Sequence, residues 1–285
     1  MSAWSVWVLE YAVAETFPWS LSVYGAHNAG THRAPFSYVV LKQGELVILV
    51  DVGFGSSPDQ MSIAEGSDVT DWRGPREVLG QIGLAPEDVT HVLITHAHYD
   101  HFGNVGAFPK ANFFISGHEL QFWTTELAVP ASLRTFTDPI DPADLIAAVE
   151  LAAQNRLHVL SDAAENLFPG IDMLPAWNTH TPGSMYIRVA TTDGPLVLAG
   201  DNVYAWENLE GWNGDGRLHP VGLVVGSNRD ATHILRTMLE DVDGQTRRVI
   251  PVHEDHLRHD YPSRTAENGA MIAEVALGPG ETSRM

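Results

Sequence analysis

Apolar residues along the chain fall into short runs rich in valine, isoleucine and aromatic side chains, and such runs predict β-strands. The predicted strands cover residues 4–13, 36–41, 45–50, 91–95, 111–115, 185–190, 196–199 and 248–252. Gln43 and Gly44 lie between the second and third runs and predict a tight turn, so these two strands form a hairpin. A Thr-Asp-Gly turn joins the strands at 185–190 and 196–199 in the same way.

Helices are predicted where apolar residues recur at helical spacing behind a capping residue. The predicted helices cover residues 75–82, 118–126, 141–155 and 229–241. Asp141 and the proline after it favour a helix start. The apolar positions of that helix are Leu145, Ile146, Val149 and Leu151. The tail after Gly278 has no such pattern, and we expect it to fray.

Strands and helices alternate irregularly, with hairpins in both halves of the chain. This order indicates an α/β sandwich of mixed sheets covered by helices. The 285 residues contain no repeat and no low-complexity linker, so we expect a single domain over residues 1–285.

The net charge of the chain limits the classes of partner that it could bind. Sixteen basic against 36 acidic residues give a net charge of −20, which argues against nucleic acid or an anionic membrane surface. No uninterrupted apolar run approaches the ~18 residues of a membrane span. The first 13 residues are apolar but lack a basic start and contain Glu10, so they predict a strand rather than a signal peptide. We therefore expect a soluble, cytoplasmic protein.

The chain has no cysteine, so neither disulfides nor thiolate ligands are available. Any metal ion must be held by histidine and carboxylate side chains, which suits zinc, manganese, iron or cobalt.

Four candidate ligands lie within six residues: His96, His98, Asp100 and His101, directly after the predicted strand at 91–95. Histidines two positions apart converge only where the backbone turns sharply around a point, and a metal centre at a strand end is such a point. The alternative is a solvated, histidine-rich loop. A single pair of histidines would favour that alternative. Burying four such groups behind an apolar strand costs free energy unless a binding partner offsets it.

The segment His-x-His-x-Asp-His resembles the ligand motif of the metallo-β-lactamase superfamily. Four further motifs resemble that superfamily in the same order. They are Asp51-Val52-Gly53, His180-Thr181-Pro182-Gly183, Ala199-Gly200-Asp201 and Ile250-Pro251-Val252-His253-Glu254. The resemblance extends over residues 36–256 and implies the αββα sandwich of the metallo-β-lactamase fold.

The resemblance also implies a dinuclear centre with two divalent ions, zinc first, or manganese, iron or cobalt. The first ion would be bound by His96, His98 and His180, and the second by Asp100, His101 and His253. Asp201 and a hydroxide would bridge the two ions. Asp51 would orient a ligand histidine, or else cap a turn.

Two departures from the superfamily pattern matter. Ser184 stands where many members have a second histidine, at a position that is generally not a ligand. The absence of cysteine excludes the zinc β-lactamases that use a cysteine ligand.

Tyr204, three residues after Asp201, and residues 83–89 resemble the N-acyl-homoserine lactone lactonases, which act in quorum quenching. That branch implies ring opening of a lactone, or of a related cyclic amide or carbamate, by the bridging hydroxide. Tyr204 would donate a hydrogen bond to the oxyanion, and Asp100 would pass a proton to the leaving oxygen. The alternative for Tyr204 is a buried core tyrosine.

The expected partner is a small molecule with an apolar or aromatic part. Candidate pocket residues, or else core residues, are Phe122, Trp123, Trp177, Trp206 and Trp212. We interpret residues 119–169 as a helical insertion that shapes the pocket or a homodimer interface. His27 and His32 could contact substrate, although a surface loop is the better interpretation.

Three other functions remain open. A glyoxalase II-like thioesterase would need more basic residues than the C-terminal part offers beyond Arg247, Arg248, Arg258 and Arg264. A non-catalytic metal-binding relative would be expected to lack ligands. A flavodiiron protein would need a further flavin domain, and a persulfide dioxygenase would hold one iron per chain.

Overall fold

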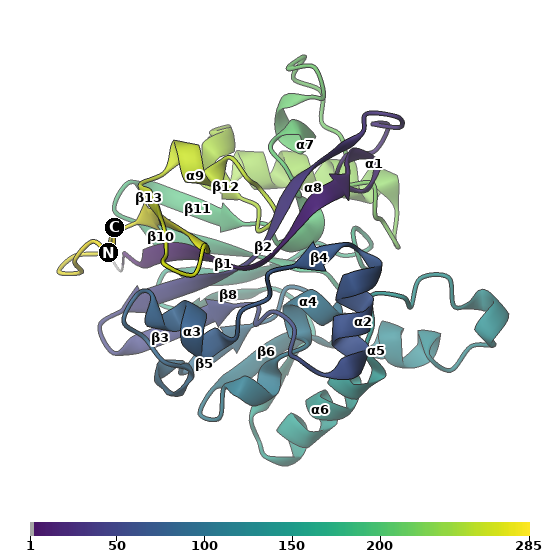
Figure 1. The fold of residues 1–285 in the computed structure, drawn as a ribbon, viewed down its shortest axis with the longest axis horizontal. Coiled ribbons are helices and arrows are strands. Elements are labelled where there is room, and N and C mark those ends of the chain that lie inside the picture. Colours follow the sequence, from purple (N-terminus) through teal and green to yellow (C-terminus); the bar gives the residue numbers. More distant parts are fainter. Residues whose placement is uncertain (1–2) are drawn as a thin grey trace.

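Two β-sheets lie face to face in the computed structural model, which describes residues 3–285, and helices cover the outer face of each sheet (Figure 1). This is the αββα sandwich of the predicted fold class. Among the described residues, no helix is long and apolar enough to cross a bilayer.

The larger sheet is mixed. In spatial order its strands are β13 (Ser263–Thr265), β14 (Met271–Ala276), β1 (Ser5–Pro18), β2 (Thr31–Gln43), β3 (Leu46–Val50), β5 (His91–Leu93), β6 (Asn112–Ser116) and β7 (Leu157–Leu160), and β4 (Val69–Thr70) pairs with β1. The strands from β14 to β3 are antiparallel, whereas β3, β5, β6 and β7 run parallel. The carboxyl ends of the parallel strands therefore point to one edge.

The smaller sheet contains β12 (Val249–Ile250), β11 (Gly194–Leu198), β10 (Met185–Thr191), β9 (Ile171–Pro175) and β8 (Ala164–Phe168), in that order. β11 and β12 are parallel and the other pairs are antiparallel. The predicted strand at 248–252 is thus reduced to two paired residues.

β1 shows why the N-terminal run is apolar at almost every position. Val6 and Val8 face the second sheet, while Trp7, Leu9 and Tyr11 face the helical layer. Successive side chains of a strand point to opposite faces, and here both faces are buried.

The helices are α1 (Trp19–Ser22), α2 (Pro58–Gly66), α3 (Pro75–Gly80), α4 (Tyr99–Phe102), α5 (Gly117–Glu126), α6 (Pro142–Ala153), α7 (Glu207–Glu210), α8 (Asn228–Glu240) and α9 (Leu257–Asp260). The four predicted helices correspond to α3, α5, α6 and α8 to within a few residues, whereas α1, α2, α7 and α9 were not predicted. Short 3₁₀ turns are η1 (Pro86–Asp88), η2 (Val105–Ala107), η3 (Ala131–Leu133), η4 (Gly200–Asn202) and η5 (Thr246–Arg248). Asp141 caps α6 by accepting a hydrogen bond from the Ala143 amide.

Residues 119–169 are not wholly helical. They contain most of α5 and all of α6, but also β7 and β8, which extend one sheet each. The exposed fractions of Ile146 and Val149 are 62% and 69%, so the buried face of α6 differs from the predicted one. That this stretch is an insertion, or a homodimer interface, stays a prediction.

The sequence predicted a frayed C-terminal tail, but the structure shows the tail in contact with the larger sheet. Glu281 forms an ion pair with Lys42 at 2.5 Å, and the Arg284 amide donates to Glu274 at 2.9 Å. These contacts hold the tail against β2 and β14.

Candidate metal centre

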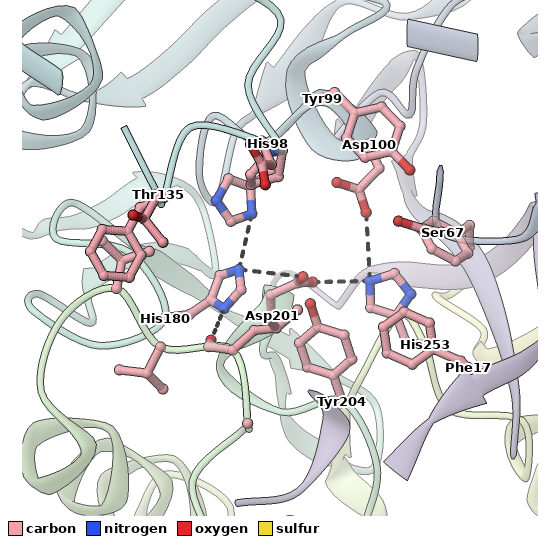
Figure 2. A pocket seen from close by; sticks show the side chains of 18 residues that line it. Phe17, Ser67, His98, Tyr99, Asp100, Thr135, His180, Asp201, Tyr204 and His253 are labelled. Carbon is pink, nitrogen blue, oxygen red and sulfur yellow. Dashed lines mark hydrogen bonds and ion pairs between the residues drawn. The ribbon is translucent and has the colours of Figure 1, made fainter. Parts of the chain in front are cut away.

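The candidate ligands all follow strands that end at the same edge of the sandwich. His96 and His98 lie between β5 and α4, and Asp100 and His101 lie on α4. The others come from the smaller sheet: His180 from the β9–β10 loop, Asp201 from η4 after β11, and His253 from the turn after β12. Each is at most 8% exposed. The structure therefore brings together all seven residues that the sequence predicted as ligands. Figure 2 shows the five of them that line the neighbouring cavity: His98, Asp100, His180, Asp201 and His253.

These side chains form two clusters that share Asp201. One cluster contains His96, His98, His180 and Asp201, and the other contains Asp100, His101, Asp201 and His253. Within each cluster the possible ligand atoms lie within 4.8 Å of one another. This division matches the predicted division between two ions, although the ligand role of each residue stays a prediction.

The polar atoms around Asp201 fit a bound cation. Nε2 of His96, His101 and His253 and Oδ1 of Asp201 are buried and have no hydrogen-bond partner in suitable geometry. The Nε2 atoms of His101 and His253 lie 3.0 and 3.2 Å from Asp201 Oδ1. An unsatisfied buried polar atom costs about 1–3 kcal/mol. A divalent ion bound by these nitrogen and oxygen atoms would satisfy all of them at once.

Hydrogen bonds fix which imidazole nitrogen faces the centre. His180 Nδ1 lies 2.6 Å from the Leu223 carbonyl oxygen, and His253 Nδ1 lies 2.9 Å from that of Pro35. A carbonyl only accepts, so Nδ1 carries the proton and Nε2 of a neutral ring presents its lone pair to the centre.

Asp51 orients another imidazole of the second cluster, that of His101. Its Oδ2 lies 2.8 Å from His101 Nδ1, while its oxygens accept from the amide and hydroxyl of Thr95 at 2.8 and 2.9 Å. Asp51 therefore contacts a candidate ligand histidine, as the sequence predicted.

The electrostatics differ between the two clusters. Burial, together with the neighbouring His180, lowers the pKa of His98 to about 3. Burial also lowers the pKa of His101, but the carboxylates of Asp201, Asp100 and Asp51 outweigh it and raise that pKa well above its usual value. In the absence of metal the second cluster thus retains protons, which metal binding would release.

Glu119 was not recognised from the sequence. It is fully buried and accepts four hydrogen bonds, from Ala97 N (3.0 Å), Trp123 Nε1 (2.6 Å), Thr181 Oγ1 (2.7 Å) and Gly183 N (2.9 Å). Burial raises its pKa, while these donors oppose that shift. Two of the partner loops lie 22 and 62 residues away along the chain, and a single sequence carries no signal for such contacts.

A cavity of about 340 Å³ opens beside both clusters. Its walls are mostly apolar: Phe17, Phe36, Phe136, Pro139, Leu223, Val224 and Val225. Tyr204 also lines the cavity, with its ring stacked on His253 at 4.8 Å and its hydroxyl towards Asp201 (Figure 2). The lining side chains include neither lysine nor arginine among the described residues.

The aromatic residues proposed from the sequence do not line this cavity. Trp123 lies buried behind His98, with ring centroids 5.4 Å apart, and Trp206 is buried and donates to the Val249 carbonyl. Trp212 packs on Trp19. The remaining two, Phe122 and Trp177, also lie outside the cavity wall. Phenylalanines from β1, β2 and the segment before α6 take their place.

His27 and His32 do not line the cavity either. His27 is exposed, and His32 stacks on Trp19 at 3.8 Å and contacts Ser22 Oγ at 2.7 Å. Ser184 lies inside the His180 loop, where its hydroxyl accepts from the Thr181 amide.

Curated relatives match parts of the chain. An N-acyl homoserine lactonase of Bacillus sp. is 26% identical over 134 residues, which are 47% of this chain and 46% of the relative. N-acyl homoserine lactonase AiiB of Agrobacterium fabrum is 27% identical over 165 residues, 55% of each chain. Mouse metallo-β-lactamase domain-containing protein 1 is 55% identical over 40 residues, 14% of this chain and 15% of that one. The chain thus spans between about a seventh and about half of the length of these relatives.

Solved structures match almost the whole fold. A variant of B. thuringiensis AiiA with N-decanoyl-L-homoserine bound superposes with a TM-score of 0.65 over 92% of this chain and 98% of that one, at 18% identity. AidC, described as a dizinc quorum-quenching lactonase, gives a TM-score of 0.63 over 99% and 97%, also at 18% identity. At this identity the likeness establishes the fold.

A family model described as the metallo-β-lactamase superfamily matches residues 30–253, a stretch that begins before Asp51 and ends at His253. It includes all the residues of both clusters. The chain belongs to the metallo-β-lactamase superfamily.

Proposed function

We propose that this chain is a dinuclear-metal hydrolase that opens a neutral cyclic ester, with N-acyl-homoserine lactones as the first substrates to test. The observation that carries the proposal is the pair of clusters sharing Asp201 at the floor of an apolar cavity. The relatives named as N-acyl homoserine lactonases motivate the choice of lactone.

Each cluster would bind one divalent ion, zinc first, or manganese, iron or cobalt. His96, His98 and His180 would hold one ion, and Asp100, His101 and His253 the other, with Asp201 contacting both. Bound there, the ions would supply a water-derived nucleophile at neutral pH and polarise the substrate carbonyl.

Tyr204 is the proposed hydrogen-bond donor to the developing oxyanion. Burial, together with the Asp201 and Asp100 carboxylates, raises the pKa of Tyr204 well above its usual value, so its hydroxyl keeps its proton. On the other side of the centre, Asp100 Oδ2 lies 3.8 Å from His253 Nε2. We propose that this carboxylate passes a proton to the leaving oxygen.

The lack of basic side chains in the cavity favours a neutral substrate. The described lining residues include neither lysine nor arginine, and the proposed ions would offset the charges of Asp100 and Asp201. A glutathione thioester carries carboxylates that would find no basic side chain to pair with in this lining. The apolar walls suit an acyl chain, and about 340 Å³ lies within the range of roughly 300–1,000 Å³ for small-molecule sites. A lactone is therefore favoured over a thioester.

The test is a hydrolysis screen of the metal-loaded chain with product masses measured. Lactones with graded acyl chains, cyclic amides, cyclic carbamates and a glutathione thioester are compared. We expect addition of one water to the lactones, increased turnover with an apolar acyl chain, and loss of turnover in His98→Ala. Ile146→Ser, at an exposed position of α6, is the control. Faster turnover of the thioester than of any lactone would favour the glyoxalase II-like alternative.

A further inference from the structure

One buried carboxylate joins the two loops that carry the ligands of the first cluster. Glu119 Oε1 accepts from the Ala97 amide, which lies between His96 and His98. Its Oε2 accepts from the Thr181 hydroxyl and the Gly183 amide, in the loop that carries His180. A single side chain of α5 therefore fixes the separation between these two ligand segments.

The backbone packing at Gly183 supports the same link. A Cβ added to Gly183 would lie 2.1 Å from the Glu119 backbone nitrogen, so the His180 loop packs directly against the first turn of α5. Glycine is required here by this close approach.

The second cluster is held differently. His101 is oriented by Asp51, and His253 by the Pro35 carbonyl. Among the described residues, the hydrogen bonds of Glu119 reach the segments of His96, His98 and His180 and none of the segments of Asp100, His101 or His253.

We propose that Glu119 is a positioning residue for the first metal site, and that it sets the metal affinity of that site without setting that of the second. This inference rests on the dinuclear centre of the proposed function. It does not depend on which bond the enzyme hydrolyses.

The hydrogen-bond chemistry makes Glu119→Gln a sharp variant. Four donors point at two carboxylate oxygens, and glutamine replaces one oxygen with an NH₂ group. In one orientation this group opposes the Ala97 amide, and in the other it opposes the Gly183 amide. The variant thus keeps the shape of the side chain and disconnects one ligand loop.

The experiment loads the full chain with Zn²⁺ and measures release of the ions to a competing chelator. Co²⁺-loaded protein gives the visible absorption of each site as a second signal. We expect the wild-type chain to release two ions. In Glu119→Gln we expect one ion to bind as in the wild type and the other to bind about 10- to 100-fold more weakly.

The control is Glu274→Gln. Glu274 is likewise buried and accepts from a tryptophan indole, Trp7 Nε1, and from a backbone amide, Arg284 N, but on β14. This variant is expected to keep both ions at wild-type affinity. Thr181→Val removes a single donor from Glu119 and is expected to weaken binding of the same ion to a smaller extent. This variant tests the inference even if Glu119→Gln does not fold.

Wild-type affinity for both ions in a folded Glu119→Gln chain, or equal weakening of both ions, would overturn the inference. If the wild-type chain binds two ions but hydrolyses no lactone, the proposed substrate is wrong and the inference on Glu119 still stands or falls by the metal titration.

Discussion

His180 donates its Nδ1 proton to the backbone carbonyl oxygen of Leu223 over 2.6 Å, and the side chain of Leu223 lines the cavity beside the metal clusters. One chain segment therefore orients a candidate ligand with its backbone and forms part of the cavity wall with its side chain. Metal binding and substrate preference can be separated experimentally at this residue.

Leu223→Ala should change substrate preference while leaving metal content unchanged. The side chain is 40% exposed in the free protein, so covering it with an acyl chain is worth about 1 kcal/mol, on the order of 5-fold in kcat/KM. We expect that loss for long-chain lactones and little change for short-chain ones. Val149→Ala, on the exposed face of α6, is the control. An equal loss for both lactones would contradict the assignment.

Tyr204→Phe tests the proposed oxyanion donor. Removing one such donor lowers kcat by about 10²- to 10³-fold, and we expect KM and bound metal to change little. Tyr38→Phe is a matched control, because its hydroxyl is buried without a hydrogen-bond partner away from the cavity. If the two variants have similar kcat values, Tyr204 is a packing residue.

Asp51→Asn should weaken the second metal site. The carboxylate orients His101 and accepts from Thr95, and loss of such a partner lowers metal affinity by about 10- to 100-fold. Chelator competition on the zinc-loaded chain measures this. The weakened ion should be the one that Glu119→Gln leaves intact, and a double variant should weaken both. Weakening of the same ion by both substitutions would contradict the separate roles of the two carboxylates.

Asp144 should make the stability depend on pH. Burial, with a contribution from Asp141, raises the pKa of Asp144 from 3.8 to about 7. The folded state therefore binds the proton more tightly than the unfolded state. The stabilisation present below about pH 4 is lost as the pH rises through about 7.

Asp144→Asn removes this loss while keeping an acceptor for Gln60 Nε2. The free energy of unfolding of Asp144→Asn, relative to that of the wild-type chain, should increase by about 1–3 kcal/mol between about pH 5 and about pH 8. Urea unfolding at both values measures it, with Asp193→Asn in an exposed turn as background. A pH-independent difference would show that Asp144 keeps an ordinary pKa.

The cluster His96 to His101 could be recognised from the sequence because four potential ligands directly follow an apolar strand, β5. His180, Asp201 and His253 were predicted because their segments resemble the later motifs of the superfamily, and the structure places Asp201 and His253 after β11 and β12. The apolar strands of the hairpin β2–β3 were predictable because their pattern and turn are local.

The cavity walls and the Glu119 link could not be predicted, because they depend on contacts far apart in sequence. Phe17 and Phe36 reach the site because β1 and β2 pair beyond the rest of the sheet. The strand β14 depends in the same way on pairing with β1, where Trp7 lies opposite Glu274. Of the tryptophans chosen from the sequence, Trp123 and Trp206 pack into the core, whereas Trp177 is exposed.

The central claim is a dinuclear hydrolytic centre, and titration of the metal-free chain with Zn²⁺, followed by lactone opening, tests it most directly. We predict no turnover without metal and a plateau at two ions per chain, with a product heavier than the lactone by one water. Full turnover in the metal-free chain, or a plateau at one ion per chain, would contradict the claim.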